Sequence, residues 1–249
     1  MKTYNIIFSP TGGTAKTADA ITQSWPGTTT IDLSDNKLCD TIILEENSLS
    51  LIVMPSFGGV APQLALDRLA KIKTNHAKCA IAAVYGNRAY EDTLIQMKDY
   101  AEQAGFQVIA AVSAIAEHSI IHEYAAGRPN STDCVQLRSF GDLIFKKATE
   151  KCESISVPGN RPYKKSGSAM VPKAGSACNC CGLCAKKCPS GAISFESPKI
   201  TDKSKCIGCM RCVSICPQRA RKVSPVMTRL AALAIKKACS EAKSNELFI

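Results

Sequence analysis

The sequence predicts an α/β protein in which a doubly wound parallel sheet is followed by a small, cysteine-rich α+β domain. Apolar, strand-like runs alternate with helical patterns over the first half, which is typical of a parallel sheet covered on both faces. Two cysteine runs of identical spacing then follow near the C-terminus. The predicted boundaries are 1–152 for the sheet domain, 153–172 for a linker, 173–224 for the cysteine-rich domain and 225–249 for a C-terminal helix and tail.

The elements of the first half follow from residue type and periodicity. Strand formers between turn residues mark the strands, and apolar positions at helical spacing mark the helices. The predicted strands are Thr3–Phe8, Thr28–Leu33, Ser50–Met54, Cys79–Tyr85 and Phe106–Ala116. The predicted helices are one that ends near Trp25, then Gln63–Lys73, Glu91–Ala104 and Thr132–Lys151. Ligands on such sheets bind beyond the carboxyl ends of the strands.

Both cysteine runs read C-x2-C-x2-C-x3-C-P, a spacing typical of proteins that hold two iron–sulfur clusters. Three cysteines at i, i+3 and i+6 can direct thiolates to three corners of one cube, while the fourth cysteine points to the other cluster. The spacing therefore predicts two [4Fe-4S] clusters with crossed ligation. One would be held by Cys178, Cys181, Cys184 and Cys216, and the other by Cys206, Cys209, Cys212 and Cys188.

Other roles for the cysteines remain open at this point. Structural zinc sites also use C-x2-C pairs, although they usually separate two such pairs by a longer loop. A disulfide framework is disfavoured in a chain of this length without a signal peptide. Cys180, inside the first run, could replace a ligand or oxidise, or it could be a bystander. The remaining cysteines are predicted to be structural: Cys39, Cys79, Cys134, Cys152 and Cys239.

The net charge of +10 is unevenly distributed. Residues 1–152 carry 14 basic and 16 acidic side chains, a net −2, whereas residues 153–249 carry 17 and 5, a net +12. Two clusters, each −2 with its four thiolates, would reduce the second value to about +8. No aromatic–basic platform accompanies the charge, so nucleic acid is not a predicted partner. Without a membrane-spanning run or targeting segment, we expect a cytoplasmic protein.

The loop after the first strand, Ser9-Pro10-Thr11-Gly12-Gly13-Thr14, has the composition of a phosphate site. Its glycines let the backbone approach a ligand, its hydroxyls can donate, and the following helix N-terminus favours an anion. The loop lacks G-x-G-x-x-G and G-K-[ST], which disfavours a dinucleotide or a nucleoside triphosphate. An ordinary glycine-rich turn is the alternative.

Two further loops combine glycine with aromatic residues at strand ends. They are Pro55–Val60 and Tyr85–Tyr90. Such loops suit a flat ring that is held by backbone groups and stacked on a side chain. A phosphate at the first loop and a ring between the next two describe a mononucleotide, most naturally FMN. His118, which follows the fifth predicted strand, could also reach the rim of this site.

These motifs resemble known redox proteins. S-x-T-G-x-T after the first strand resembles flavodoxin, and the whole chain resembles flavodoxin–ferredoxin fusions of the EFR1 family, including F-S-P-T-G-G-T, Y-G-N-R-A-Y and A-A-G-R-P. The resemblance implies a flavodoxin-like sheet of order 2-1-3-4-5 beside a dicluster ferredoxin domain. It implies that the FMN phosphate is held by Ser9, Thr11, Gly12, Gly13 and Thr14. It implies that the isoalloxazine ring is held by Ser56, Phe57, Gly58, Gly59, Tyr85, Gly86, Asn87, Arg88, Ala89 and Tyr90.

Two departures from the flavodoxin pattern bear on the flavin. Gly13 stands where typical flavodoxins have Asn, which removes one side-chain donor. The only tryptophan, Trp25, lies at the end of the first helix, so it cannot stack on the ring. Phe57 or Tyr90 would have to do so, unless these rings only pack the loops.

The expected function is electron transfer between a two-electron FMN and one-electron clusters. The alternatives are an FMN-dependent iron–sulfur reductase of a small substrate, and a ferredoxin whose first domain only docks. A redox partner, a ferredoxin or an oxidoreductase, could meet the basic surface at Lys186, Lys187, Lys203, Lys205 and Arg211, unless these residues only aid solubility. The helix within Pro225–Ile249 is expected to pack on the body. The oligomeric state stays open.

Overall fold

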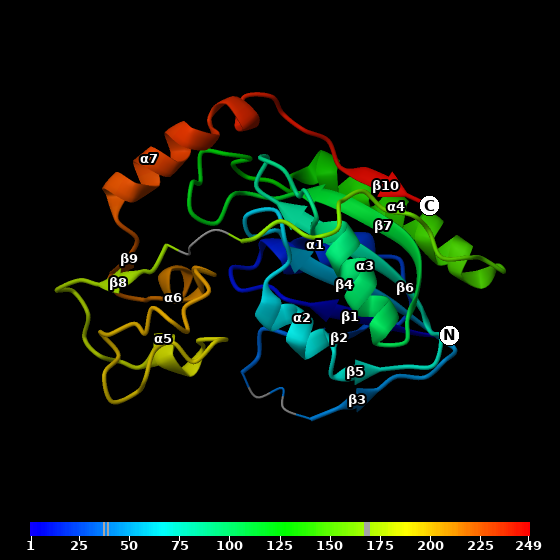
Figure 1. Cartoon of the computed structure of the whole chain (residues 1–249), viewed down its shortest axis with the longest axis horizontal. Helices are drawn as coiled ribbons and strands as arrows, with labels where there is room; N and C mark the ends of the chain where they lie inside the picture. Colours follow the sequence, from blue (N-terminus) through cyan, green and yellow to red (C-terminus); the bar gives the residue numbers. More distant parts are fainter. Residues whose placement is uncertain (37, 39, 167–169) are drawn as a thin grey trace.

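The main sheet contains six strands in the order β10-β7-β6-β4-β1-β2. The computed structural model describes residues 1–36, 38, 40–166 and 170–249 (Figure 1). The five parallel strands are β1 (Lys2–Ile7), β2 (Thr29–Asp32), β4 (Ser48–Pro55), β6 (Lys78–Tyr85) and β7 (Gln107–Ile115). Counted along the chain, they lie in the order 2-1-3-4-5 of flavodoxin-like doubly wound sheets. The predicted fold class is therefore confirmed.

Helices cover both faces of this sheet (Figure 1). On one face lie α2 (Gln63–Leu69) and α3 (Thr93–Gln103), and on the other lie α1 (Gly13–Ile21) and α4 (Ser131–Thr149). Along β4, Ile52 packs toward α2 and α3, whereas Leu51 and Val53 pack toward α1 and α4. Because successive side chains of a strand point to opposite faces, an apolar run such as β4 is buried on both.

Two predicted helices are too long. The first ends at Ile21, and Trp25 instead packs beyond it, where its indole Nε1 donates to the carbonyl of Gly141 at 3.0 Å. The second ends at Leu69, because Ile72–Lys73 form the short strand β5, which pairs with β3 (Ile42–Ile43). The buried side chain of Ile72 belongs to the core beneath α2 and continues the apolar pattern without continuing the helix.

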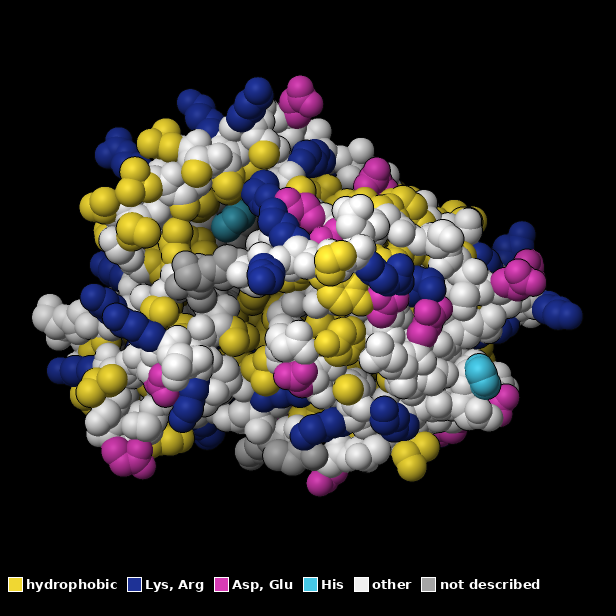
Figure 2. Space-filling view, in the orientation of Figure 1, with side chains coloured by type: hydrophobic (Ala, Val, Ile, Leu, Met, Phe, Trp, Pro, Cys, Tyr) yellow, Lys and Arg dark blue, Asp and Glu magenta, His cyan; other side chains and the backbone are white. Residues whose placement is uncertain are grey.

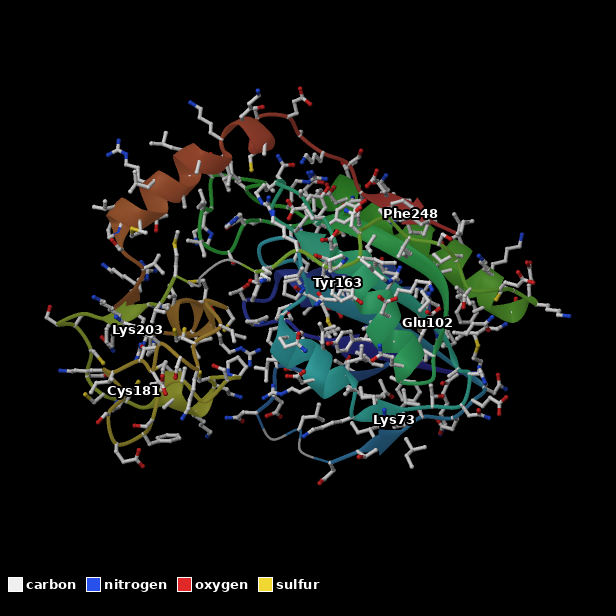
Figure 3. The ribbon with its side chains drawn as sticks, in the orientation of Figure 1. Lys73, Glu102, Tyr163, Cys181, Lys203 and Phe248 are labelled. Atoms are coloured by element: carbon white, nitrogen blue, oxygen red, sulfur yellow. The ribbon has the colours of Figure 1, made fainter. Side chains whose placement is uncertain are left out.

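The described part of the predicted linker is anchored along the sheet domain. The backbone N–H of Ile155 donates to the carbonyl oxygen of Val108 at 3.1 Å. Asp92 accepts hydrogen bonds from the backbone N–H groups of Asn160 and Lys164, at 2.8 and 2.7 Å. Tyr163 lies over the sheet domain (Figure 3), where its hydroxyl donates to Asp99. Positions 167–169 of this predicted segment lie outside the described residues.

In the cysteine-rich domain, the two cysteine runs fold alike. The first leads into α5 (Leu183–Lys186) and the second into α6 (Arg211–Ser214). The residues that precede these helices, Gly182 and Met210, both adopt left-handed backbone conformations, with φ of 72° and 61°. The antiparallel strands β8 (Lys173–Ala174) and β9 (Arg221–Lys222) close the domain.

The C-terminal segment returns to the main sheet. The helix α7 (Pro225–Ile235) passes above the cysteine-rich domain, and η1 (Lys237–Cys239) and β10 (Glu246–Phe248) follow (Figure 1). The helix was predicted to pack on the body, but none of its residues is buried, and the Tyr124 hydroxyl donates to its Ala232 carbonyl at 2.8 Å. Its outer side chains are exposed and form an apolar patch, at the upper left in Figure 2: Val226, Met227, Leu230 and Leu233. Within the described part of the chain, no helix is both long and apolar enough to cross a membrane.

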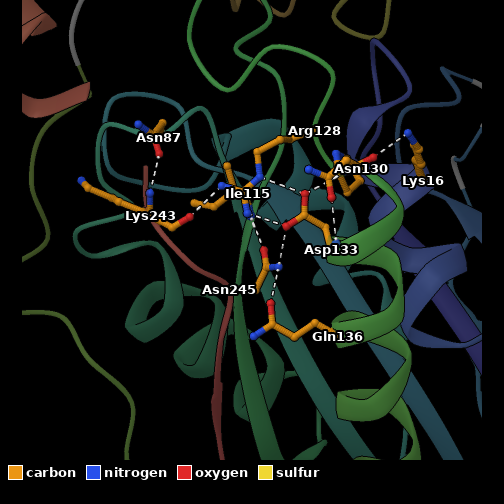
Figure 4. A network of polar contacts seen from close by, with 10 residues as sticks. Lys16, Asn87, Ile115, Arg128, Asn130, Asp133, Gln136, Lys243 and Asn245 are labelled. Carbon is orange, nitrogen blue, oxygen red and sulfur yellow. Dashed lines mark hydrogen bonds and ion pairs between the residues drawn. The ribbon is translucent and has the colours of Figure 1, made fainter. Parts of the chain in front are cut away.

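A polar network fixes the returning tail beside β7 (Figure 4). The side chain of Asn245 accepts from the backbone N–H of Ile115 at 2.9 Å and donates to Asp133 at 3.1 Å. Asp133 also accepts from Arg128, which in turn donates to the carbonyl of Lys243 at 2.6 Å. The tail strand β10, which the sequence did not predict, therefore pairs antiparallel to β7 in a defined position.

Candidate functional site

A cavity of about 670 Å³ lies beyond the carboxyl ends of the parallel strands. Its size is within the range of small-molecule sites. We call it the sheet-edge cavity. Loops after β1, β4, β6 and β7 contribute much of its wall, and the remainder comes from the linker, the cysteine-rich domain and α7. From the three predicted loops, the lining residues include Thr11, Gly13, Thr14, Ser56, Phe57, Gly58, Tyr85, Gly86, Arg88 and Ala89.

The loop after β1 is the one that the sequence predicts to bind a phosphate. Gly12 precedes α1 with φ of 97°, a conformation that favours glycine. The Ser9 hydroxyl accepts the backbone N–H of Ala15 at 2.9 Å, which fixes the loop against the helix. The N-cap residue Gly12 has no side chain that could cap the helix, and the first turn of α1 contains no acidic residue. The helix N-terminus is therefore available to a phosphate.

The loop after β4 contributes Ser56, Phe57 and Gly58 to the cavity wall. The backbone N–H of Phe57 donates to the carbonyl oxygen of Val60 at 2.8 Å and closes the turn of this loop. Gly59 does not line the cavity wall. A Cβ atom at this position would lie 1.7 Å from a carboxylate oxygen of Glu91, so glycine leaves room for that side chain.

In the loop after β6, Asn87 and Tyr90 point away from the cavity wall. The Asn87 amide donates to the carbonyls of Cys239 and Glu241 at 3.1 and 2.8 Å and so holds the tail. The Tyr90 ring packs edge-on against Tyr85, with centroids 5.3 Å apart. Of the two aromatic residues proposed to stack on a ring, only Phe57 lines the sheet-edge cavity.

The loop after β7 is a part of the site that sequence analysis identified only through His118. The Nδ1 atom of His118 accepts the backbone N–H groups of Ile120 and Ile121, at 3.2 and 3.1 Å. Burial lowers the pKa of this imidazole, with the charges of His122 and Arg88 acting in the same direction. The ring is therefore neutral with its proton on Nε2, which leaves an N–H donor at the cavity wall.

An ion-pair cluster closes one side of the cavity. Arg88 donates to both carboxylate oxygens of Glu91 at 3.0 Å, and Lys164 of the linker binds the same carboxylate at 2.7 and 2.8 Å. The hydrogen bond from Arg88 is the main reason that the pKa of Glu91 is lowered, and Lys164 adds to it. Lys164 and Met170 also line the cavity, so the linker forms part of the site.

The thiols of the cysteine-rich domain form two sets that combine both runs. Cys178, Cys181, Cys184 and Cys216 line a second, smaller cavity, and we call them the outer thiol set. Burial alone would raise the pKa of Cys216, but backbone N–H groups, including that of Ala220 at 3.3 Å from the sulfur, lower it overall. Cys181 is exposed and lies away from the main sheet (Figure 3), and Cys180 is exposed beside it.

The inner thiol set comprises Cys188, Cys206, Cys209 and Cys212. Cys188 is buried in a small apolar cluster that Cys184, Cys206 and Cys212 contact. Burial raises the pKa of Cys206, raises that of Cys209 to about 11 and raises that of Cys212 to about 12. Such thiols ionise readily only beside a cation, and iron would supply one. Grouping each fourth cysteine with the other run follows the crossed arrangement that the spacing predicts, and the ligation of two clusters by these sets stays a prediction.

The remaining cysteines have no common site. Cys79 and Cys239 are buried, and Cys134 and Cys152 are partly buried. Cys39 lies outside the described residues. Within the described ranges, no three His, Cys, Asp or Glu side chains are arranged closely enough to share a single metal ion.

The inner thiol set faces the sheet-edge cavity. Cys206, Ile207, Gly208 and Cys209 all line it. Ile207 packs against the core on the α2 and α3 side of the sheet. Arg68 of α2 donates to the carbonyls of Leu33 and Pro189 at 2.6 and 2.7 Å and so bridges the two domains.

Arg211 does not belong to an exposed basic surface, contrary to the sequence-based expectation. Its guanidinium donates to the carbonyls of Ser9 and Pro10 at 3.0 and 3.1 Å, and to the hydroxyl of Ser34 at 2.6 Å. The side chain therefore holds the domains together. Lys186, Lys187, Lys203 and Lys205 are exposed as expected.

Comparison with known proteins supports the character of the cysteine-rich domain. Residues 199–222 match the family described as a 4Fe-4S binding domain. A probable iron–sulfur protein of the Frd operon of Proteus vulgaris is 45% identical over 53 residues, which are 20% of this chain and 34% of that protein. The chain therefore spans about a third of that relative.

Solved flavodoxins resemble the first part of the chain at low identity. A flavodoxin from the domain Archaea is 14% identical, with 60% of this chain and 100% of that chain covered and a TM-score of 0.42. A Fusobacterium nucleatum flavodoxin bound to flavin mononucleotide is 18% identical, with 59% and 99% covered and a TM-score of 0.39. By its own strand order and its iron–sulfur match, the chain joins a flavodoxin-like fold to a 4Fe-4S binding domain.

Proposed function

We propose that this protein transfers electrons between FMN in the sheet-edge cavity and two [4Fe-4S] clusters. The observation that carries the proposal is that one cavity is lined both by the predicted flavin loops and by Cys206–Cys209. When bound, FMN exchanges two electrons and each cluster exchanges one, so the pair would connect two-electron and one-electron pools.

The loops of the sheet domain would bind the flavin. Thr11, Gly13 and Thr14 line the cavity at the helix N-terminus, where a phosphate is favoured, while Ser9 and Gly12 shape that loop. The ring would lie between the other two loops, with Phe57 and Tyr85 as its aromatic neighbours. Three residues would support these loops without lining the cavity. Gly59 leaves room for Glu91, Asn87 donates to the tail, and Tyr90 packs against Tyr85.

The two thiol sets would act in sequence. The inner set lines the sheet-edge cavity, so its cluster would exchange electrons with the flavin directly. The outer set includes the exposed Cys181, so its cluster would exchange electrons with a partner. The contacts of Arg68 and Arg211 hold this order in place, since they fix the inner set against the sheet domain.

An acidic redox protein, such as a ferredoxin, is the partner that the surface near the outer set favours. Phe195 and Ile200 are exposed there, and the position of a Cβ on Gly182 would lie 3.1 Å from the Phe195 ring. The exposed lysines of this domain are Lys173, Lys186, Lys187, Lys199, Lys203, Lys205 and Lys222. An apolar centre with a basic rim complements an acidic surface and guides its approach.

A second candidate function is an FMN-dependent reductase of a small substrate. The observation that favours it is the neutral His118, whose Nε2–H is available as a donor at the wall of the same cavity. Steady-state turnover of a small oxidant that requires FMN and declines in His118→Asn would support this role.

Cofactor analysis of anaerobically purified protein tests the main proposal. We expect one FMN, about eight iron atoms and about eight sulfides per chain. Rapid mixing with a reductant should then show flavin and cluster absorbance changing with shared kinetic phases. Protein with zinc in place of iron, or with iron but no flavin, would contradict the proposal.

A further inference from the structure

Arg221 in β9 is a buried cation with an incompletely satisfied guanidinium. Only 2% of the residue is exposed. One terminal nitrogen donates to the Thr201 hydroxyl at 2.6 Å and to the carbonyl of Pro172 at 3.4 Å, and the other donates to the carbonyl of Pro198. The third nitrogen, Nε, is buried and has no hydrogen-bond partner among the described residues. Buried donors of native proteins are rarely left in this state.

The position of Arg221 connects it to the outer thiol set. It lines the smaller cavity together with all four cysteines of the outer thiol set. The side chain is held by carbonyl and hydroxyl oxygens, which orient it without cancelling its charge.

A buried charge requires a counter-charge. No described carboxylate forms an ion pair with Arg221. A [4Fe-4S] cluster with four thiolates carries about −2 and offers sulfur acceptors, so it would supply both the missing charge and the missing hydrogen-bond partner. Such hydrogen bonds and charges are among the factors that set cluster potentials.

We propose that Arg221 is a positioning residue that donates its Nε–H to a sulfur of the outer cluster and raises the reduction potential of that cluster. A fixed positive charge stabilises the additional electron of the reduced state. The outer cluster is therefore favoured as the place where electrons collect before they leave the protein. This inference rests on the proposed function for the clusters but not on the presence of FMN.

The test compares Arg221→Met, Arg221→Lys and the control Lys222→Met, all purified anaerobically with iron and sulfide quantified. Lys222 is the exposed neighbour in the same strand, so its replacement removes an equal charge without a buried contact. Electron paramagnetic resonance during redox titration gives each potential, and Cys181→Ser identifies the outer cluster's signal. We expect Arg221→Met to shift the one-electron equilibrium of the outer cluster at least about tenfold toward the oxidised form, which is about 59 mV. The reduction potential of the inner cluster should change less.

Arg221→Lys keeps the charge but lacks the Nε–H group and the planar fork. This variant should load iron, and it should lower the reduction potential of the outer cluster by less than Arg221→Met does. Labelling arginine with ¹⁵N should give a nitrogen coupling to the reduced outer cluster that Arg221→Lys abolishes. Two outcomes would overturn the inference. One is an unchanged reduction potential of the outer cluster in iron-loaded Arg221→Lys together with no nitrogen coupling in the parent protein. The other is that Arg221→Met and Lys222→Met shift this potential equally. A protein without clusters would instead overturn the proposed function.

Discussion

The guanidinium of Arg211 lies 3.0 Å from the carbonyl oxygen of Ser9. This contact joins the beginning of α6, next to Cys212, to the loop that precedes α1. A residue between two cysteines of the inner thiol set therefore fixes the distance from that set to the loop after β1. The electron-transfer proposal depends on this distance, because the fusion of two domains does not by itself bring their cofactors together.

Replacement of Arg211 should slow internal electron transfer. Arg211→Ala removes charge-assisted hydrogen bonds to Ser9, Pro10 and Ser34, each of which contributes about 1.5–3 kcal/mol in typical cases. We expect flavin and cluster absorbance to equilibrate about tenfold or more slowly after rapid mixing with a reductant, with flavin and iron contents unchanged. Lys203→Ala, an exposed change in the same domain, is the control. Equal rates in both variants and the parent would show that docking does not limit transfer.

Crossed ligation predicts which cluster each fourth cysteine supports. Cys188 is 8% exposed, and the small apolar cluster around it contacts Cys206 and Cys212 of the second run as well as Cys184, although Cys188 is itself the last cysteine of the first run. Cys188→Ser should therefore damage the inner cluster, while Cys216→Ser should damage the outer one. Iron analysis and electron paramagnetic resonance of the two reduced variants distinguish the signals. Loss of the outer cluster alone in Cys188→Ser would show that each run binds its own cluster.

The loop after β1, the proposed phosphate site, should control flavin affinity. Thr11 and Thr14 line the sheet-edge cavity at the N-terminus of α1. The double change Thr11→Ala and Thr14→Ala should weaken flavin binding by roughly 1 kcal/mol or more for each lost hydrogen bond to a charged phosphate. Fluorescence titration of the apoprotein measures the affinity, and Thr149→Ala, at the end of α4, is the control. Mass analysis of the flavin released by heat should give FMN, and FAD would be incompatible with a site for one terminal phosphate.

His118 predicts a loss of stability between pH 7 and pH 5. Burial lowers the pKa of the folded imidazole below its ordinary value of 6.5, so the unfolded chain binds the proton more readily. Stability is therefore fully present above pH 6.5 and is lost as the pH falls from 6.5 through the lower, folded pKa. The loss is about 1.4 kcal/mol for each unit by which the two pKa values differ.

His118→Asn provides the comparison, because an amide oxygen can still accept from Ile120 and Ile121 but does not titrate. The melting temperature of this variant should fall less between pH 7 and pH 5 than that of the parent. His76→Asn is the matched control, since His76 is exposed and its φ of 57° is tolerated by Asn. If the melting temperatures of both variants depend on pH as that of the parent does, another group controls stability in this pH range.

Local signals explain what could be predicted from the sequence. The parallel strands are apolar runs buried on both faces, and the cysteine spacing is set by the geometry of a single loop. Both signals lie within short segments, so the strands and the cysteine pattern were accessible from residues alone, whereas the strand order came from the resemblance to flavodoxin. The short strand β5 was missed because Ile72 satisfies an apolar helical pattern as well as it satisfies its buried strand position.

Contacts between distant segments explain what could not be predicted. Arg211 lies in a basic stretch and has the sequence appearance of a solvent-exposed residue, but its carbonyl partners are far away in the chain. Asn87 lies in a predicted ring-binding loop and instead binds the tail. The strand β10 spans only Glu246–Phe248, too short for a periodic signal, and is fixed by Asn245 and Asp133.

The apolar centre beside the outer thiol set predicts a partner-specific effect. Phe195 is 60% exposed and lies over Gly182, between two cysteines of that set. Phe195→Ser should reduce the rate of electron transfer to an acidic plant-type ferredoxin about fivefold to thirtyfold, since loss of an aromatic interface anchor costs about 1–2 kcal/mol or more. Internal transfer between flavin and clusters should not change.

Leu230→Ser is the matched control for this prediction, because Leu230 is 57% exposed on α7, away from the outer thiol set. Stopped-flow mixing of each reduced variant with the oxidised ferredoxin measures the rate, and its dependence on ionic strength should be retained in both, since the lysines remain. Phe195 is adjacent to the cluster through which electrons are proposed to leave, whereas α7 lies over the sheet-edge cavity. A slower rate in Leu230→Ser with an unchanged rate in Phe195→Ser would therefore move the docking surface to α7 and would exclude the outer cluster as the point of exit.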